Sequence, residues 1–258
     1  MKKLMVIAVA LALLLTMSVG TPVAASTVWH VYPDATPGAT PIQDAVDTAS
    51  PTDTIIVHKG IYRERVIVDV ANLTIRASGP MVEVRSVGNE AFLIEANGVT
   101  VHGFKAQCEG VHVIMVDLPD DVIISNVIIS NNIVHGGEKV GIGLDTAYGC
   151  KVINNRVSSP GGIGIRVKWS STGNLVKGNT VYARSDGIVL AENANDNSVI
   201  GNWVLGSEEK GISLITASSN NLIKRNLALA SGEYDLFWDG SGTGNTWEKN
   251  KYKTSNLP

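Results

Sequence analysis

The chain has 258 residues and a formal net charge of −3 at pH 7. This length suits one globular or solenoidal domain, and a slight acidic excess gives no electrostatic reason to expect a nucleic-acid partner. Only two cysteines occur. Small secreted domains that depend on disulfide bonds usually carry several pairs, so another kind of interaction must hold this fold together.

The first 25 residues have the pattern of a secretory signal peptide. Lys2 and Lys3 precede an apolar stretch over residues 4–15, and small residues then lead to a cleavage point after Ala25. A membrane span would need about 18 to 20 apolar residues, and no later segment approaches that length. We therefore expect residues 1–25 to be removed and the mature protein, beginning near Ser26, to be secreted, periplasmic or at the cell surface.

Residues 26–53 are expected to form an N-terminal strand and a capping helix. Thr40 is in position to be the N-cap of this helix, and Pro41 suits its first turn. One helical face is apolar and comprises Ile42, Ala45, Val46 and Ala49. Such a face predicts that the helix covers one end of a hydrophobic core.

Residues 54–258 repeat with a period of 23 or 24 residues, and asparagine marks two columns of the repeat. The first column comprises Asn126, Cys150, Asn174, Asn197, Asn221 and Asn245, and the second comprises Asn131, Asn155, Asn179, Asn202, Asn226 and Asn250. A third column comprises Gly141, Gly164, Gly187, Gly211 and Asp235. Self-similarity at this period indicates a solenoid.

Aliphatic residues follow each column at the spacing of inward-facing strand positions. Beyond the asparagines these are Ile128, Val152, Val176, Val199, Ile223 and Trp247, and Ile133, Val157, Val181, Val204, Ala228 and Tyr252. Beyond the glycines, pairs such as Ile165 and Val167 alternate with other residues. Three short strands per repeat predict about eight coils of a parallel β-helix. Asparagines should stack one strand spacing apart, about 4.8 Å, and adopt the left-handed backbone of the bends.

The earliest coils and the C-terminus depart from the regular pattern. Residues 97–108 align on 120–131, which places Gly103 and Cys108 one coil before Asn126 and Asn131. Cys108 and Cys150 are then too far apart to form a disulfide, and we expect two free thiols that replace asparagine in the bends. Large rings, expected to cap the C-terminal end, replace aliphatic residues at Tyr234, Phe237, Trp238, Trp247 and Tyr252.

The sequence resembles right-handed β-helix proteins of the NosD type, in the group often called carbohydrate-binding and sugar-hydrolysis domains. The likeness lies in PIQDAVDTASPTDTIIVHKGIYRERVIVDVANLTIRAS, in the Asn and Gly columns, and in the ending DGSGTGNTWEKN. The resemblance implies a right-handed, pectin-lyase-like solenoid. It also implies several functional classes: polysaccharide lyases, hydrolases and epimerases, pectin methylesterases, copper-site assembly proteins and surface repeats. Fold alone does not choose among these classes.

One outward-facing group combines acidic, basic and aromatic side chains. Asp145 and Lys168 are expected to share an outward column on adjacent coils beside Arg166, and Trp169 and Glu192 follow where the strand turns away. An arginine or lysine would pair with a substrate carboxylate, Trp169 would support a sugar ring, and Asp145 would accept a proton. The alternative is an exposed cross-strand ion pair without a ligand.

Spacing and motifs narrow the reaction that such a group would catalyse. Two coils, about 9.6 Å of backbone, separate Asp145 from Glu192, which is near the upper limit for an inverting glycosidase pair. The resemblance makes pectin methylesterases, polygalacturonases and mannuronan epimerases candidate families. The sequence lacks the signature motifs of all three. An enzyme with this sequence is therefore expected to be a polysaccharide lyase rather than a hydrolase or an esterase.

Two other sets of residues suggest metal sites. His112 and His135 are 23 residues apart and are expected on neighbouring coils, about 5 Å from one another, where imidazole with nearby Met115 or Cys108 would suit copper. The competing interpretation is two half-exposed turn histidines. Residues 192–197, ENANDN, offer oxygen ligands for calcium, although such residues are also the usual constituents of turns. No recognised metal motif supports either ion.

Together these observations predict an exported β-helix that presents a polysaccharide-binding face, with β-elimination of an acidic, uronate-containing polymer as its activity if it is an enzyme. A carbohydrate polymer is the expected partner. Two alternatives stay open: a copper-assembly accessory of the NosD kind, and a non-catalytic structural element of the cell surface or envelope. The sequence does not define the oligomeric state.

Overall fold

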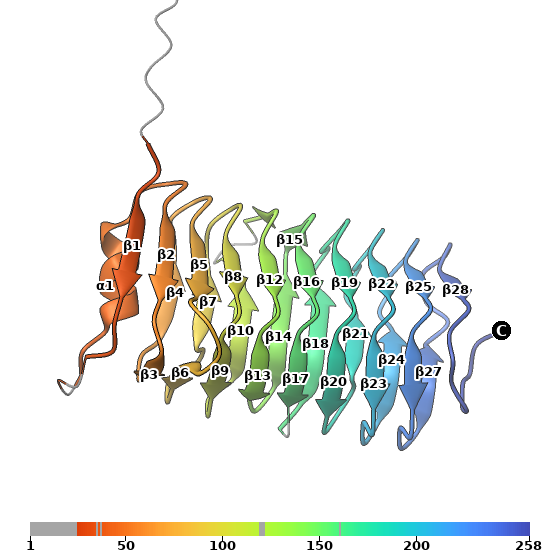
Figure 1. Ribbon diagram of the computed structural model, residues 1–258. Coiled ribbons are helices and arrows are strands. Elements are labelled where there is room, and N and C mark those ends of the chain that lie inside the picture. Colours follow the sequence, from red (N-terminus) through yellow and green to blue (C-terminus); the bar gives the residue numbers. More distant parts are fainter. Residues whose placement is uncertain (1–24, 35, 37, 119–121, 160) are drawn as a thin grey trace, which may run out of the picture.

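The computed structural model describes residues 25–34, 36, 38–118, 122–159 and 161–258. In this part of the chain, strands wind into a solenoid whose coils follow one another from the N-terminus to the C-terminus (Figure 1). Every registered strand pair is parallel, in sheets of ten, eight and eight strands and one short two-stranded sheet. The predicted all-β parallel solenoid is therefore confirmed.

Sheet A contains the strands that open each coil. They are β1 (Val28–Val31), β2 (Thr54–Val57), β5 (Thr74–Ala77), β8 (Thr100–His102), β12 (Ile128–Ser130), β16 (Lys151–Ile153), β19 (Leu175–Lys177), β22 (Ser198–Ile200), β25 (Leu222–Lys224) and β28 (Thr246–Glu248). The short sheet pairs β11 (Ile124–Ser125) with β15 (Ala147–Tyr148).

Sheets B and C complete each coil. Sheet B comprises β3 (Gly60–Tyr62), β6 (Val82–Ser86), β9 (Lys105–Cys108), β13 (Ile133–Gly136), β17 (Arg156–Ser159), β20 (Thr180–Ala183), β23 (Trp203–Leu205) and β26 (Leu227–Leu229). Sheet C comprises β4 (Val66–Val68), β7 (Phe92–Ile94), β10 (His112–Val116), β14 (Val140–Asp145), β18 (Ile163–Lys168), β21 (Ile188–Leu190), β24 (Lys210–Leu214) and β27 (Tyr234–Trp238). The described residues thus form eight complete coils from β2 to β27, as the repeat predicts.

Aliphatic columns fill the interior of the solenoid. On sheet C, Ile142, Ile165 and Ile188 pair in register and are completely buried. Each such side chain contributes about 1.5 to 3 kcal/mol when it leaves water. The glycine column is confirmed as well: a Cβ on Gly141 would lie 2.6 Å from the side chain of Val157 and 2.8 Å from the carbonyl oxygen of Gly164. Only glycine fits where the chain passes so close to the next coil.

Stacked asparagines form two buried ladders at the ends of sheet A. Asn155 donates its backbone N–H and one side-chain N–H to Oδ1 of Asn179, at 2.8 and 3.1 Å, and its other side-chain N–H to the carbonyl of Ile129 at 2.9 Å. The same bonds recur along this ladder to Asn250, and the second ladder runs from Asn174 to Asn245. Every amide before the last one of each ladder uses both of its side-chain N–H groups, so the predicted stacking is confirmed.

The expected register is wrong by one residue in the coil of β12 and β13. The ladder residue there is Asn132, not Asn131, and Val127 rather than Asn126 lies beside Cys150. The buried positions are consequently Ile129 and Val134, whereas the predicted Ile128 is half-buried and Ile133 is exposed. The expected conformation also needs correction, because positive φ angles fall on the residue before each ladder asparagine, including Asn131, Asn154, Gly178, Gly201, Arg225 and Lys249.

The step from β8 to β12 is 28 residues rather than 23 or 24. The additional residues lie in the segment between β10 and β12, which includes β11. Gly103 therefore lies one coil before Asn131, and Cys108 lies one coil before Gly136, so the sequence alignment of this coil is wrong by five residues. Both cysteines are free and buried, as predicted, but only Cys150 replaces a ladder asparagine.

Helix α1 (Pro41–Thr48) covers the N-terminal end of the coils (Figure 1). Ile42 and Val46 are buried and Pro41 occupies the first turn, as predicted. Thr40 is the N-cap residue but makes no side-chain cap bond. Instead the carboxylate of Glu64 accepts the backbone N–H groups of Ile42 at 3.1 Å and of Gln43 at 2.8 Å.

Aromatic residues close the C-terminal end only in part. Trp238 and Trp247, together with Leu257, pack against the core. Tyr234 and Tyr252 are exposed, so their predicted place in the cap is wrong. The predicted signal peptide, residues 1–25, lies outside the described residues except for Ala25, and it stays a prediction. No helix in the described part of the chain is long and apolar enough to span a membrane.

Candidate functional site

Asp145, Arg166 and Lys168 meet on the outer surface of sheet C. Asp145 ends β14 and Lys168 ends β18, and the two residues pair in register. Arg166 lies opposite Gly143 in the same pair of strands. Because side chains alternate along a strand, these residues point outward while Leu144 and Val167 point into the core. The predicted column is therefore confirmed, and we call these three residues the Asp145 cluster.

The Asp145 cluster is buried rather than exposed. Oδ2 of Asp145 lies 2.8 Å from a guanidinium nitrogen of Arg166 and 3.8 Å from Nζ of Lys168. The side chain of Asp145 is only 1% exposed, against 13% for Arg166 and 14% for Lys168. The cross-strand ion pair of the alternative interpretation is therefore present, but its predicted exposure is wrong. Burial removes the solvent screening that makes surface ion pairs weak.

Gly143 makes room for this ion pair. A Cβ at this position would lie 2.4 Å from Sδ of Met115 and 3.9 Å from the guanidinium of Arg166. The side chain of Met115 therefore fills the space above the glycine from the preceding coil. Any larger residue at position 143 would displace Met115 and narrow the space beside Arg166.

Several polar atoms of this region have no hydrogen-bond partner. Within the described residues these are Oδ1 of Asp145, Nε of Arg166 and Oε2 of Glu192, all buried. Buried polar atoms are nearly always paired, since an unpaired one costs about 1 to 3 kcal/mol. Burial also raises the pKa of Asp145 to about 6, against the opposing effects of Arg166 and Lys168. The arrangement thus retains unsatisfied polar atoms around a carboxyl group that titrates near neutrality.

Trp169 and Glu192 occupy the turn that leads from sheet C to sheet A. Both have left-handed backbone, as do Ser170 and Asn193 after them, and the N–H of Ser170 donates to the carbonyl of Glu192 at 2.9 Å. Trp169 and Glu192 therefore lie on adjacent coils, as their spacing predicts. Left-handed conformation is unfavourable for a bulky residue, and such strain is often kept where a side chain has a function.

An open hollow of about 780 Å³ lies beside this turn. Its lining residues are Ile123, Thr146, Trp169, Ser170, Glu192 and Asn193. Trp169 is 43% exposed, and Nζ of Lys168 lies 3.2 Å from the centre of its indole ring. We call this feature the Trp169 hollow. Lys168 connects it to the Asp145 cluster because its ammonium contacts both.

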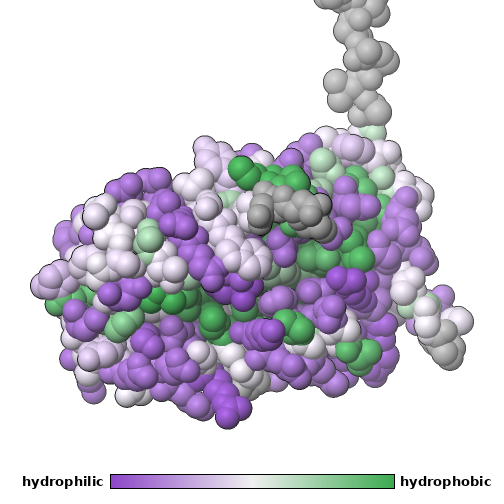
Figure 2. All heavy atoms as spheres, turned by 180° about the vertical axis from the view of Figure 1, so that it is seen from behind, coloured by the Kyte–Doolittle hydropathy of each residue, from purple (hydrophilic) through white to green (hydrophobic). Residues whose placement is uncertain are grey.

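The outward row of sheet C is largely apolar on either side of the cluster. Leu93 and Met115 precede Gly143 and Arg166 in this row, and Val189 follows them. Viewed from behind, the molecule shows hydrophobic atoms in a band along the coils with hydrophilic atoms on both sides (Figure 2). A binding site of this composition would combine apolar contact area with a few buried charges.

Comparison with known proteins establishes the family. A sequence profile described as right handed beta helix region matches residues 60–228. The chain belongs to the right-handed β-helix family. No curated protein matches the sequence. The broader part of the resemblance is thus confirmed, while its NosD and carbohydrate-binding specificity stays a prediction.

Solved structures of similar fold include three polysaccharide enzymes. The alignment with pectate lyase Pel9A has a TM-score of 0.66 at 11% identity, and it covers 92% of this chain and 80% of the lyase chain. An alginate lyase from Paenibacillus sp. str. FPU-7 has a TM-score of 0.61 at 13% identity, covering 90% and 100%. The periplasmic alginate epimerase AlgG has a TM-score of 0.66 at 14% identity, covering 87% and 55%. At these identities the likeness concerns fold alone.

The two histidines predicted to bind metal lie on different sheets of the β-helix. His112 pairs with Val140 on sheet C, whereas His135 pairs with Gln107 and Ser158 on sheet B. Their predicted proximity is therefore wrong, because the 28-residue step separates their columns. Among the residues that the structure describes, no group of three or more histidine, cysteine, aspartate or glutamate side chains is arranged to hold a metal.

Turn bonds engage part of the predicted calcium segment at residues 192–197. Oδ1 of Asn195 accepts the N–H of Ser219 at 2.7 Å, and Asn197 belongs to a ladder. Asp196 adopts the left-handed conformation that precedes each ladder asparagine. Asn195 and Asn197 therefore have architectural roles, while Glu192 retains an unpaired oxygen.

A charged network next to the Asp145 cluster was not evident from the repeat pattern. Oε2 of Glu90 accepts two bonds from Arg65, at 3.0 and 2.7 Å, and its Oε1 lies 3.5 Å from Nδ1 of His112. Burial lowers the pKa of His112, and the charge of Arg166 adds to this effect. Arg65, Glu90 and His112 do not fall in one column when the repeats are aligned from the sequence alone. The strand register of the structure shows that they lie side by side.

Proposed function

We propose that this protein binds an acidic, uronate-containing polysaccharide at the Asp145 cluster and the Trp169 hollow. The observation that carries the proposal is the set of buried polar atoms without partners at Asp145, Arg166 and Glu192, beside an exposed indole ring. The fold adds support, because proteins of similar structure are named pectate lyase, alginate lyase and alginate epimerase. Pectate and alginate are both polymers of uronic acids.

Each part of the site would contribute to recognition in a different way. The indole ring of Trp169 offers an apolar surface for the C–H face of a pyranose ring. Nε–H of Arg166, which has no partner, would donate to a substrate carboxylate directly or through water. Glu192 and Asn193 on the rim of the hollow would accept and donate bonds with sugar hydroxyl groups. A few sugar residues match the size of this hollow.

Binding is tested with short oligouronates and isothermal titration calorimetry. We expect the wild-type protein to bind them, and Trp169→Ala to weaken binding by about tenfold or more, the equivalent of about 1.4 kcal/mol. Lys168→Gln should weaken it as well. Tyr252→Ala and Lys177→Gln provide matched controls, because both residues are exposed and neither lines the hollow: Lys177 ends β19 on sheet A, and Tyr252 follows β28. Unchanged affinity in Trp169→Ala would refute this site.

β-Elimination is a second candidate function, and the state of Asp145 favours it. Its Oδ1 has no hydrogen-bond partner among the described residues and its pKa lies near 6, so above that pH the carboxylate is ionised and able to accept a proton when substrate binding opens access to this buried side chain. In this reaction a base removes the C5 proton of the uronate, the C4–O bond breaks, and a C4–C5 double bond forms. The departing oxygen takes a proton from water, the protonated Asp145 later returns its proton to solvent, and Arg166 neutralises the substrate carboxylate that stabilises the intermediate charge.

Incubation with polygalacturonate, polymannuronate and polyguluronate, followed by ultraviolet detection of unsaturated ends, tests the elimination. Asp145→Asn should abolish product while oligouronate binding persists. Arg166→Lys, which keeps the charge but not the forked geometry, should lower the rate. Absence of unsaturated ends with all three polymers would restrict the protein to binding. Absence of both product and binding would contradict the proposed function altogether.

Export completes the proposal, since an extracellular polysaccharide requires a protein outside the cytoplasm. Support comes from the signal-peptide pattern of residues 1–25. N-terminal sequencing of protein expressed with its full N-terminus in a bacterial host should find a mature chain that starts near Ser26. An intact Met1 in a cytoplasmic fraction would refute export.

A further inference from the structure

The outer surface of sheet B carries a second group of cationic and aromatic side chains. Two outward rows run along this sheet, and their paired positions follow from the strand register. One row includes Lys105, Arg156 and Trp203, and the other includes Arg63, Arg85 and Tyr182. We call these six residues the sheet B stripe. None of them belongs to the Asp145 cluster or the Trp169 hollow.

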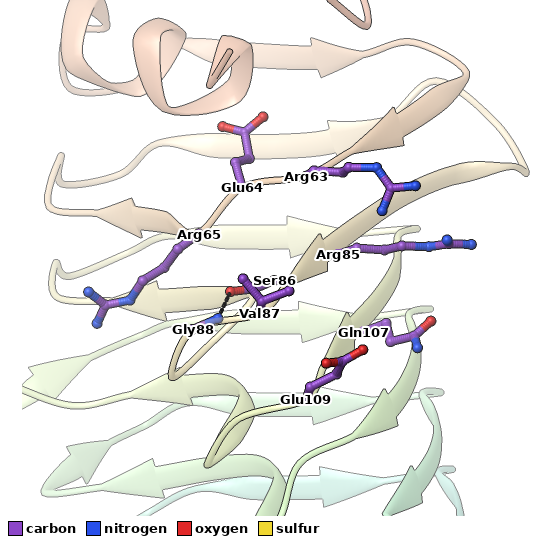
Figure 3. Close-up of a pocket in the computed structure, with 9 residues that line it drawn as sticks. All are labelled: Arg63, Glu64, Arg65, Arg85, Ser86, Val87, Gly88, Gln107 and Glu109. Carbon is purple, nitrogen blue, oxygen red and sulfur yellow. Dashed lines mark hydrogen bonds between the residues drawn. The ribbon is translucent and has the colours of Figure 1, made fainter. Parts of the chain in front are cut away.

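The N-terminal half of the stripe is cationic. Tyr62 pairs with Val84, so Arg63 and Arg85, which follow them, lie on adjacent coils. Their side chains extend to the same side, whereas Glu64 points toward α1 and Arg65 points away (Figure 3). Among the described residues Arg63 has no ion-pair partner, while Glu83 binds both Arg85, at 2.7 Å, and Lys105, at 3.0 Å.

A hollow of about 450 Å³ lies next to these arginines and includes Gln107 and Glu109 in its lining. The stripe and this hollow together contain five cations, since Arg65 also lines the hollow, against the three carboxylates of Glu64, Glu83 and Glu109. The local charge is thus positive although the whole chain has a net charge of −3. A guanidinium group with free N–H donors binds carboxylate or sulfate groups through two parallel bonds.

The C-terminal half of the stripe is aromatic. Trp203 is 58% exposed and Tyr182 is 37% exposed, and they lie diagonally on the neighbouring strands β23 and β20. The guanidinium of Arg156 lies 5.6 Å from the centre of the Tyr182 ring. This contact holds the phenol ring beside a cation and joins the two halves of the stripe. Exposed rings on a rigid sheet provide apolar area at low entropic cost.

We infer that the sheet B stripe is a binding track for an anionic polysaccharide that lies across the coils, separate from the site on sheet C. The rings of Tyr182 and Trp203 would carry pyranose faces, and the cations would pair with acidic groups of the same chain. A single-stranded nucleic acid also combines anionic groups with stacking rings. The polysaccharide is the occupant we favour, because proteins of similar fold are named pectate lyase, alginate lyase and alginate epimerase.

Affinity electrophoresis in native gels that contain long polyuronate chains tests the inference. The wild-type protein should migrate more slowly in these gels than in gels with a neutral glucan, and added salt should reduce the difference. The double variant Tyr182→Ala/Trp203→Ala should lose at least about tenfold in affinity, because it removes both rings that would carry pyranose faces. Arg63→Gln/Arg85→Gln should lose a similar factor and much of the salt dependence.

Tyr252→Ala and Lys177→Gln serve as matched controls, and circular dichroism confirms that each variant folds. Wild-type mobility of both double variants in polyuronate gels would overturn the inference. Equal retardation by neutral glucan, stronger retardation by single-stranded DNA, or dimerisation that is lost in Tyr182→Ala/Trp203→Ala would do the same. The result is separable from the sheet C proposal, because Trp169→Ala is expected to lose short oligouronates yet keep its retardation by long chains.

Discussion

The asparagine ladders and the Asp145 cluster both bury polar side chains, yet they differ in how those side chains are satisfied. Asn179 uses both hydrogens of its amide and both acceptor positions of its oxygen. Asp145 binds Arg166 and Lys168 through Oδ2, whereas its Oδ1 lacks a partner among the described residues. The amide of Asn179 thus has all its hydrogen-bond partners within the chain. The Asp145 cluster contains polar atoms, Oδ1 of Asp145 and Nε of Arg166, that have no hydrogen-bond partner among the described residues.

This difference separates architecture from recognition in a fold where both depend on stacking. A ladder bond connects identical residues on successive coils, so every coil supports the next one. The Asp145 cluster interrupts the repeat with one acidic and two cationic side chains, and Gly143 lies beside them. An open hollow lies next to the cluster. Natural proteins rarely tolerate unpaired buried groups unless a ligand, water or reaction uses them.

Removal of a ladder amide should have the largest effect on stability. Asn179→Ala leaves two donors of Asn155 without an acceptor and removes a donor to Asn202 and to Val152. We expect a loss of about 4 to 6 kcal/mol in the free energy of unfolding, measured by denaturant titration. Asn89→Ala, at an exposed asparagine, should change it by less than about 0.5 kcal/mol. Similar midpoints for the two variants would show that the ladder is dispensable.

Removal of charge from the Asp145 cluster should lower the free energy of unfolding somewhat less than removal of a ladder amide. The size of the decrease should depend on whether one charge or all three are removed. Asp145→Ala leaves Arg166 and Lys168 buried without a counter-charge, which predicts a loss of about 3 kcal/mol. The triple variant Asp145→Leu/Arg166→Met/Lys168→Met replaces all three charges by apolar groups and should recover most of that loss. It should nevertheless fail to bind oligouronates. A triple variant less stable than Asp145→Ala would indicate that the cluster serves the fold rather than a ligand.

The pH dependence of stability should distinguish the two regions further. Burial raises the pKa of Asp145 from 3.8 to about 6, so between these values the folded protein holds a proton that the unfolded chain has released. The stability of the folded protein therefore falls as the pH rises through this window, by about 3 kcal/mol in total. Asp145→Asn should remove this decrease, and ladder variants should retain it. Denaturant titrations from pH 4 to pH 8 provide the measurement.

Glu64 requires a parallel control in that experiment. Burial raises its pKa from 4.5 to about 7, so it also favours the folded state at low pH and loses that contribution as the pH rises toward neutrality. Glu64→Gln should therefore flatten the upper part of the same profile. If Asp145→Asn and the wild-type protein show parallel profiles, the carboxyl group at position 145 does not titrate in this range.

The sequence predicted the coils well but not the depth of the candidate site. Regular steps from Cys150 onward revealed the ladders, since each coil there has nearly the same length. Before that point two adjacent asparagines, Asn131 and Asn132, both match one column of the repeat. The positive φ of Asn131 and the hydrogen bond from Asn132 to Asn155 show that Asn132 is the ladder residue. A pattern of residue types does not contain that choice.

Alternation along strands correctly placed Asp145, Arg166 and Lys168 on one outer surface. It did not predict their burial, because burial depends on the missing side chain at Gly143 and on Met115, which arrives from the preceding coil. The register of that coil depends on the 28-residue step, which no repeat of constant length would reveal. Predictions that used this step, including the proximity of His112 and His135, failed for the same reason.

The smallest expected effect concerns the one cysteine that stands in a ladder. Sγ of Cys150 accepts the N–H of Val127 at 3.4 Å and lies 3.8 Å from the carbonyl of Ile124, while its own N–H donates to Oδ1 of Asn174 at 2.8 Å. Cys150→Asn would supply a stronger acceptor and two better donors at the same place, and we expect it to stabilise the fold by about 1 kcal/mol. Cys150→Ala, which offers no acceptor to Val127, should destabilise it. A Cys150→Asn variant less stable than Cys150→Ala would contradict this expectation, because it would mean that the ladder begins at Asn174 and that position 150 does not accommodate a stacked amide.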